Sequence, residues 1–194
     1  MELLSEEEQW DRLKAWLRTN GPSVLGLTAL MLLGWFGWQW WQDRGQARNV
    51  AAGTAYQSII SSFNMGESGM GLAAIETLRS DYPGSPYVAA ADLLAANVFV
   101  GSNELDKAAE RLERVANSAP DELLRPVARL RLARVQSAKG DYEAALATLG
   151  AAEMGVHEPA RLEVRGDVLL ASGDRDGALR EYEAALLLLP EAEQ

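Results

Sequence analysis

Residues 129–149 (RLRLARVQSAKGDYEAALATL) and 162–182 (LEVRGDVLLASGDRDGALREY) repeat one pattern at an offset of 33 residues. Each copy has a small residue, a second small residue twelve positions later, and a large residue four positions beyond that. These positions hold Ala133, Ala145 and Leu149 in the first copy and Gly166, Ala178 and Tyr182 in the second. A fixed period of this length is typical of chains built from stacked supersecondary units.

The spacing is that of the tetratricopeptide repeat (TPR), a hairpin of two helices. Residues 89–122 repeat it with Ala96, Ala108, Leu112 and Pro120, and a degenerate earlier unit precedes Pro83. We therefore predict an all-α fold with a single N-terminal transmembrane helix followed by a TPR-like solenoid of helical hairpins. The predicted domain covers residues 43–194, with units at about 46–83, 89–122, 126–158 and 159–192.

Small residues on the first helix of each unit are expected to let the second helix approach, while the large residue fills the remaining gap. Gly140-Asp141 and Gly173-Asp174 can end one helix with a left-handed residue and begin the next with an Asp cap.

Inward-facing positions of the first helices predict a binding groove. In TPR units these are positions 2, 5, 9 and 12, and here they hold a mixture of apolar and polar residues. The candidate groove residues are Leu93, Asn97, Val100, Leu130, Arg134, Ser137, Glu163, Asp167 and Leu170. For each position the alternative is ordinary packing between repeats or a solvated helix face. Only Asn97 matches the TPR domains that clamp a C-terminal carboxylate, so we do not expect that activity.

The last repeat ends in Leu186-Leu187-Leu188-Leu189 before Pro190, and no polar capping helix follows. Either this helix packs back on its own repeat or its apolar face docks a partner. We favour the second interpretation, which includes self-association through the C-terminal helix.

Residues Val24 to Trp41 (VLGLTALMLLGWFGWQWW) contain no charged residue. A helix of this length spans roughly 27 Å, close to the hydrocarbon core of a bilayer. Tryptophans prefer the headgroup level, and four of them stand near the end of the run: Trp35, Trp38, Trp40 and Trp41. We predict a transmembrane anchor at 22–42. The alternative is a helix buried in a soluble core, which rarely has so long an apolar run.

Residues 1–21 precede the anchor as an acidic leader. A cleaved signal peptide would have a short basic leader and a small-residue cleavage site, so we predict an uncleaved anchor. Trp10, Leu13 and Leu17 share one face of an amphipathic helix that we expect to break at Gly21-Pro22. This helix could lie on the membrane surface, bind a partner, or act only as a solubilising cap.

The basic residues that flank the anchor favour a cytoplasmic N-terminus. Arg12, Lys14 and Arg18 precede it, whereas Arg44 and Arg48 follow it closely. Basic residues are retained on the cytoplasmic side, so the domain at 43–194 is expected on the opposite side.

Composition excludes several function classes. The 28 acidic and 18 basic residues give a net charge of −10, which argues against nucleic-acid binding. The chain has no cysteine and a single histidine, His157. It contains no phosphate-binding or nucleophile motif, and its carboxylates are spaced as on solvated helix faces. We therefore expect no enzyme activity, no catalytic or metal-binding residues and no cofactor.

Several segments resemble the YfgM family of bacterial inner-membrane proteins, the ancillary subunit of the SecYEG translocon. They are the acidic Trp-containing leader, the Trp-rich anchor, AYQSI (55–59), NELDKAAERL (103–112), RLRLARVQ (129–136) and RGDVLLASGD (165–174). The resemblance implies a single-pass protein of the bacterial inner membrane with a cytoplasmic N-terminus and a periplasmic TPR domain. It also implies association with the SecYEG translocon and with a PpiD-like periplasmic chaperone that assists newly translocated proteins.

Two other functions remain open. The TPR domain could be a scaffold for assembly of another envelope complex, such as the one for cytochrome maturation. Alternatively, the cytoplasmic leader could bind a soluble regulator.

Overall fold

A computed structural model describes residues 6–150 and 155–189, apart from the side chains at 6–9, 12, 13, 17, 19, 22–25 and 41–46. Every regular element in these ranges is helical, which confirms the all-α prediction. The elements are α1 Glu6–Asn64, α2 Ser68–Asp81, α3 Pro86–Gly101, α4 Leu105–Ser118, α5 Leu124–Lys139, α6 Tyr142–Gly150, the short 3₁₀ helix η1 Gly155–His157, α7 Glu158–Ser172 and α8 Arg175–Leu187.

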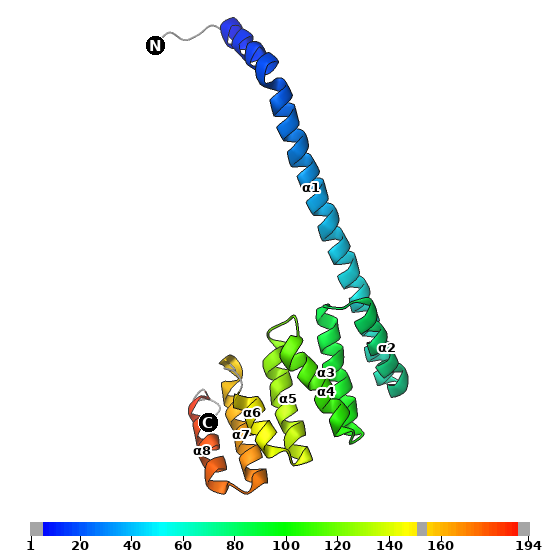
Figure 1. Ribbon diagram of the computed structural model, residues 1–194, viewed down its shortest axis with the longest axis vertical. Helices are drawn as coiled ribbons and strands as arrows, with labels where there is room; N and C mark the ends of the chain where they lie inside the picture. Colours follow the sequence, from blue (N-terminus) through cyan, green and yellow to red (C-terminus); the bar gives the residue numbers. More distant parts are fainter. Residues whose placement is uncertain (1–5, 151–154, 190–194) are drawn as a thin grey trace. The chain divides into compact units, whose positions relative to one another are not determined.

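The chain forms two compact units, Met1–Asn49 and Val50–Gln194. Within the first unit α1 runs without interruption through Gly21 and Pro22, so the predicted helix break at this point is wrong. Proline cannot donate the helical hydrogen bond to the residue four positions earlier, but a helix can absorb this loss by kinking. Figure 1 shows a bend in the blue part of α1.

The apolar stretch of α1 is exposed along its described length. Leu27, Leu30, Leu33, Trp35 and Trp38 each expose more than half of their surface. Val24, Leu25 and Trp41 lie outside the described side chains. Among the described residues, no helix meets both the length and the hydropathy that crossing a bilayer requires.

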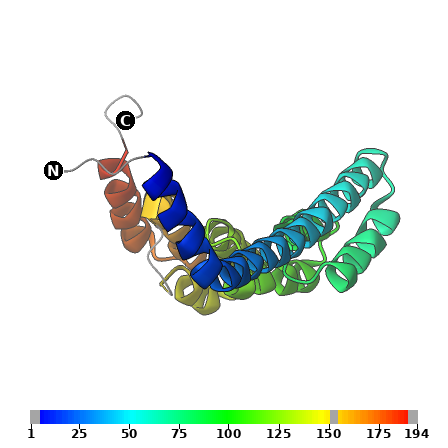
Figure 2. The ribbon, with the colours of Figure 1, turned by 90° about the horizontal axis from the view of Figure 1, so that it is seen from above.

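In the second unit the helices form successive hairpins: the end of α1 with α2, α3 with α4, α5 with α6, and α7 with α8 (Figure 1). Seen from above, these hairpins follow one another along an arc (Figure 2). Gly140 (φ 85°) and Gly173 (φ 97°) end α5 and α7 in the left-handed conformation, as the sequence predicts. The Asp174 carboxylate accepts a 2.9 Å hydrogen bond from the Gly177 amide and caps α8.

The paired small and large residues lie where two helices of a hairpin meet. A Cβ atom on Gly166 would lie 2.5 Å from Cε1 of Tyr182, so this contact requires glycine. Ala133 and Leu149 occupy the corresponding positions one repeat earlier, and both are fully buried. The repeat pattern therefore sets how closely the helices of each hairpin approach.

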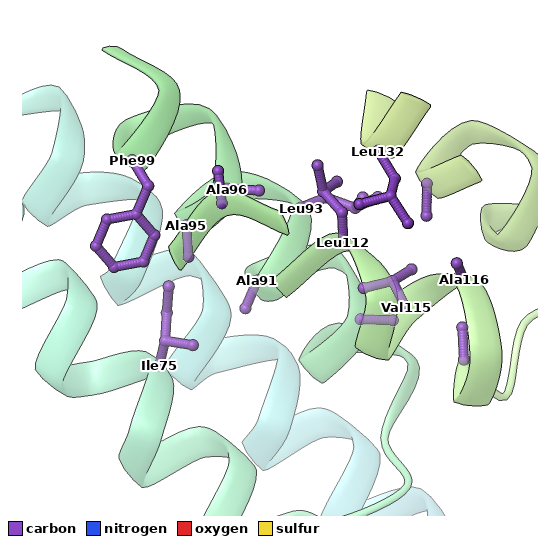
Figure 3. Packing of buried hydrophobic residues seen from close by; sticks show 14 of the residues in the cluster. Ile75, Ala91, Leu93, Ala95, Ala96, Phe99, Leu112, Val115, Ala116 and Leu132 are labelled. Atoms are coloured by element: carbon purple, nitrogen blue, oxygen red, sulfur yellow. The ribbon is translucent and has the colours of Figure 1, made fainter. Parts of the chain in front are cut away.

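Two hydrophobic clusters meet at α5. Ala128, Leu132 and Val135 belong to the larger cluster, which extends from the end of α1 through α2, α3 and α4 (Figure 3). Leu130 and Ala133 belong to the smaller cluster with residues of α6 and α7. Because α5 is apolar on two faces, it joins the first hairpins of the unit to the last ones.

Candidate interaction groove

A hollow of about 720 Å³ opens between α3 and α5 and is called here the α3–α5 hollow. Its lining is mostly apolar. Leu93, Ala96 and Leu112, three buried residues labelled in Figure 3, are part of the lining. The full lining is Tyr56, Ala90, Leu93, Leu94, Ala96, Asn97, Val100, Leu105, Leu112, Arg131, Arg134, Val135 and Ala138.

Helical periodicity explains why these residues share one surface. The α5 lining residues are spaced i, i+3, i+4 and i+7, which places them on one stripe of the helix. On α3 the same spacing is found at Ala90, Leu93, Leu94 and Asn97. Ser85 begins α3 as its N-cap, where its hydroxyl accepts a 3.4 Å hydrogen bond from the amide of Tyr87, and Pro86 occupies the first turn.

The α3–α5 hollow has a positive edge. Arg131 and Arg134 are both exposed, and neither guanidinium has a hydrogen-bond or ion-pair partner in the described part of the chain. Among the residues that the structure describes, no Asp or Glu contributes to the lining. Arg111, by contrast, binds both Glu76 and Asp92.

An ion cluster on α2, α3 and α4 fixes the hairpins beside the α3–α5 hollow. The carboxylate of Asp92 is almost fully buried and pairs with three arginines. Arg79 donates to it, Arg111 Nη1 lies 3.1 Å away, and Arg114 Nε lies 3.4 Å away. Because the arginines come from α2 and α4 while Asp92 is on α3, the cluster connects three helices.

Glu76 belongs to the same cluster. Partial burial alone would raise the pKa of Glu76, but the hydrogen bond from Arg111 and the charges of Arg111, Arg79 and Arg114 lower it overall. The carboxylate therefore stays ionised and neutralises part of the positive charge around Asp92.

The structure brings four of the nine predicted groove residues together. Leu93, Asn97, Val100 and Arg134 line the α3–α5 hollow. Leu130 is instead buried in the smaller hydrophobic cluster. Of the other predicted residues, Ser137 is half-buried, while Glu163, Asp167 and Leu170 are exposed on α7, outside the hollow.

The α7 candidates have a local partner in α8. The hydroxyl of Tyr182 donates a 2.9 Å hydrogen bond to the Asp167 carboxylate. Desolvation, this hydrogen bond and the negative charges of Asp167 and Glu163 raise the pKa of Tyr182. This contact joins the two helices of the last hairpin. Whether these α7 residues also bind a ligand remains a prediction.

Sequence reasoning missed Arg131 and Tyr56 as lining residues. Arg131 precedes Arg134 by one helical turn, and this spacing could have been recognised from the sequence. Tyr56 lies in the degenerate first unit, where no repeat register was available. Among the described residues, no cluster of His, Asp and Glu side chains could hold a metal ion.

Comparison with known proteins identifies the family. A family model described as a tetratricopeptide repeat-like domain matches residues 14–194. The chain is also 32% identical to the ancillary SecYEG translocon subunit of Escherichia coli, covering 94% of this chain and 87% of the relative. The chain belongs to the family of ancillary SecYEG translocon subunits.

Other comparisons agree with this family and with the fold. The family member from Neisseria gonorrhoeae is 29% identical over 97% of this chain and 90% of its own length. The crystal structure of MamA has a TM-score of 0.57 at 16% identity and covers 70% of this chain and 77% of MamA, which supports the fold alone.

Proposed function

We propose that this protein is a membrane-anchored TPR interaction module accessory to the SecYEG translocon. The observation that carries this proposal is the 32% identity, over nearly the whole chain, to an ancillary SecYEG translocon subunit. The α3–α5 hollow supports an interaction role, because it is largely apolar and has the size of a ligand-binding pocket.

The proposed anchor is the segment 22–42 at the bacterial inner membrane. Leucines, tryptophans and Phe36 form a continuous exposed apolar surface between Leu27 and Trp40. Exposed apolar area of this extent is costly in water and favourable in lipid. We place the leader 1–21 in the cytoplasm, the domain 43–194 in the periplasm, and Trp35, Trp38, Trp40 and Trp41 at the membrane interface. A reporter fused at Gln194 that proved cytosolic would contradict this orientation.

Tethering explains how a groove that binds weakly can be useful. A domain held beside the exit of the translocon meets emerging chains at an effective concentration that can reach about the millimolar range. Weak contacts in the groove are then sufficient. In this proposal a PpiD-like periplasmic chaperone acts on the same newly translocated proteins.

The test is purification of the full chain from detergent-solubilised membranes, with its partners identified by mass spectrometry. We expect channel subunits and a periplasmic chaperone. Recovery of a different envelope complex alone would favour the scaffold function instead. If the cytoplasmic leader instead binds a soluble regulator, deleting residues 2–18 should change the recovered partners. Unchanged partners would contradict that hypothesis.

Self-association through α8 is part of the same proposal. Leu186, Leu187 and Leu188 are all exposed, and Leu187 is 81% exposed. We expect Leu187→Glu to lower the molar mass of the detergent-solubilised protein, measured by light scattering corrected for detergent. If the wild-type protein is a monomer and Leu187→Glu leaves its molar mass unchanged, self-association through α8 is contradicted.

A further inference from the structure

We propose that the α3–α5 hollow binds an internal peptide segment in which an acidic residue is flanked by apolar residues. The apolar side chains occupy the hollow, and the carboxylate pairs with Arg131 and Arg134. This inference rests on the proposed function, in which emerging chains are the ligands, and it specifies which of their segments are preferred.

The apolar part of the inference follows from the lining. Leu94, Val100, Leu105 and Val135 surround a space of about 720 Å³, which is within the range of about 300–1,000 Å³ typical of ligand pockets. Apolar side chains that enter this space remove both their own surface and that of the lining from water. A polar segment would gain nothing comparable.

The acidic part follows from the two arginines. Arg131 and Arg134 are three residues apart on α5, so their Cβ atoms lie about 5–6 Å apart on one helix face. Guanidinium groups bind carboxylates through two parallel hydrogen bonds. The chain carries ten more negative than positive charges, yet no carboxylate of its described part pairs with either arginine.

These features select against other occupants. A basic segment would place like charges beside Arg131 and Arg134, and a neutral apolar segment would gain no ion pair with either arginine. An inorganic anion would leave the apolar lining empty. An acidic residue within an apolar segment is complementary to both parts of the hollow.

The experiment uses the full chain in detergent and short fluorescent peptides blocked at both ends. One peptide has a central Glu between Leu and Val residues, and its matched partners have Gln or Lys at that position. We expect the Glu peptide to bind about three- to tenfold more tightly than the Gln peptide, with the Lys peptide weakest. The preference should decrease as the salt concentration increases.

Two variants test the site. Arg131→Gln/Arg134→Gln should reduce the affinity for the Glu peptide to that for the Gln peptide and leave the Gln peptide unaffected. Arg175→Gln/Arg180→Gln is the matched control, because both of its arginines are exposed on α8 and it makes the same charge change. Ala138→Trp, which adds bulk at an exposed lining residue, should weaken both peptides.

Equal affinity for the Glu and Gln peptides would overturn the inference, as would a failure of all the blocked peptides to bind. Purification of partners is carried out on the same preparations. If the protein binds the Glu and Gln peptides equally but channel subunits are still recovered with it, only the inference about the peptide is contradicted. If the protein prefers the Glu peptide but no channel subunits are recovered with it, the proposed function is contradicted and the peptide site is supported.

Discussion

At the scale of single residues, the contact between Gly166 and Tyr182 shows what the repeat pattern encodes. The Tyr182 ring occupies the space into which any larger side chain at 166 would point. One repeat earlier the same two positions are filled by Ala133 and Leu149, so a slightly larger residue on one helix is matched by a smaller one on the other. The two positions are therefore coupled.

We expect Gly166→Ala to destabilise the second unit by about 1–3 kcal/mol, because its Cβ overlaps the Tyr182 ring. The double substitution Gly166→Ala/Tyr182→Leu recreates the earlier pair and should cost less than the sum of the single changes, by about 0.5–3 kcal/mol. Urea unfolding followed by circular dichroism measures all three variants.

Gly69→Ala is the control for this series, since no atom lies within 4 Å of the added Cβ and alanine favours helix. If Gly166→Ala is as harmless as Gly69→Ala, the close contact is not a constraint.

At the scale of helices, the ion cluster around Asp92 connects α2, α3 and α4 more specifically than apolar packing does. The Asp92 side chain is only 2% exposed, whereas its three arginines keep 15–35% of their side-chain surface in contact with solvent. A buried carboxylate is stable only with such partners, so the cluster fixes the position of α3 relative to α2 and α4.

Asp92→Ala should destabilise the protein by about 3 kcal/mol, because it leaves three partly exposed guanidinium groups close together without their shared partner. The matched control is Asp106→Ala, which removes a surface carboxylate 2.8 Å from Lys139 and should cost less than about 1 kcal/mol. The shift of the urea midpoint measures both, and equal shifts would contradict a structural role for the Asp92 cluster.

The lowered pKa of Glu76 predicts a dependence of stability on pH. A carboxyl group whose pKa is lower in the folded than in the unfolded state stabilises the fold above its unfolded value. That stability is lost as the pH falls through the folded pKa. Wild type should therefore lose stability relative to Glu76→Gln as the pH falls below 4.5. Because Glu76 is 52% exposed, we expect a difference of less than about 1 kcal/mol.

Thermal unfolding of both proteins from pH 7 to pH 3 provides the test. Parallel stability curves over that range would show that the charge of Glu76 does not contribute.

At the scale of the whole molecule, the two units carry different kinds of apolar surface. The first unit exposes its described apolar residues along one helix, whereas the buried apolar residues of the second unit lie mainly in two clusters. This contrast supports the proposal that the first unit is in contact with lipid and the second with water.

Leu30→Asp/Leu33→Asp should release the protein from the membrane fraction. Replacing a leucine by aspartate near the centre of a span changes the insertion free energy by roughly 3–4 kcal/mol, and two such changes exceed the contribution of the remaining leucines. Extraction with alkaline carbonate, followed by immunoblotting of pellet and supernatant, measures the release.

Leu123→Asp/Leu179→Asp makes the same chemical change at exposed leucines of the second unit and should leave the protein in the pellet. If the Leu30 and Leu33 variant also stays in the pellet, the proposed anchor is wrong.

The sequence by itself determined the hairpins, because the spacing of small and large residues and the position of a turn glycine are local properties of the chain. Gly140, Gly173 and the Gly166–Tyr182 pair occupy the predicted places for this reason. The path of α1 through Pro22 was not predictable in the same way, since a proline within a helix can either end it or only kink it.

Only the tertiary structure decided which residues form the α3–α5 hollow. Leu130 and Arg131 are neighbours in the sequence, yet Leu130 is buried in one cluster while Arg131 borders the hollow. Successive residues of a helix point about 100° apart, and α5 packs against other helices on two sides. Assigning fixed repeat positions to a single groove face therefore places such neighbouring residues wrongly. The packing of α5 between two clusters determines which of its side chains remain accessible to a ligand.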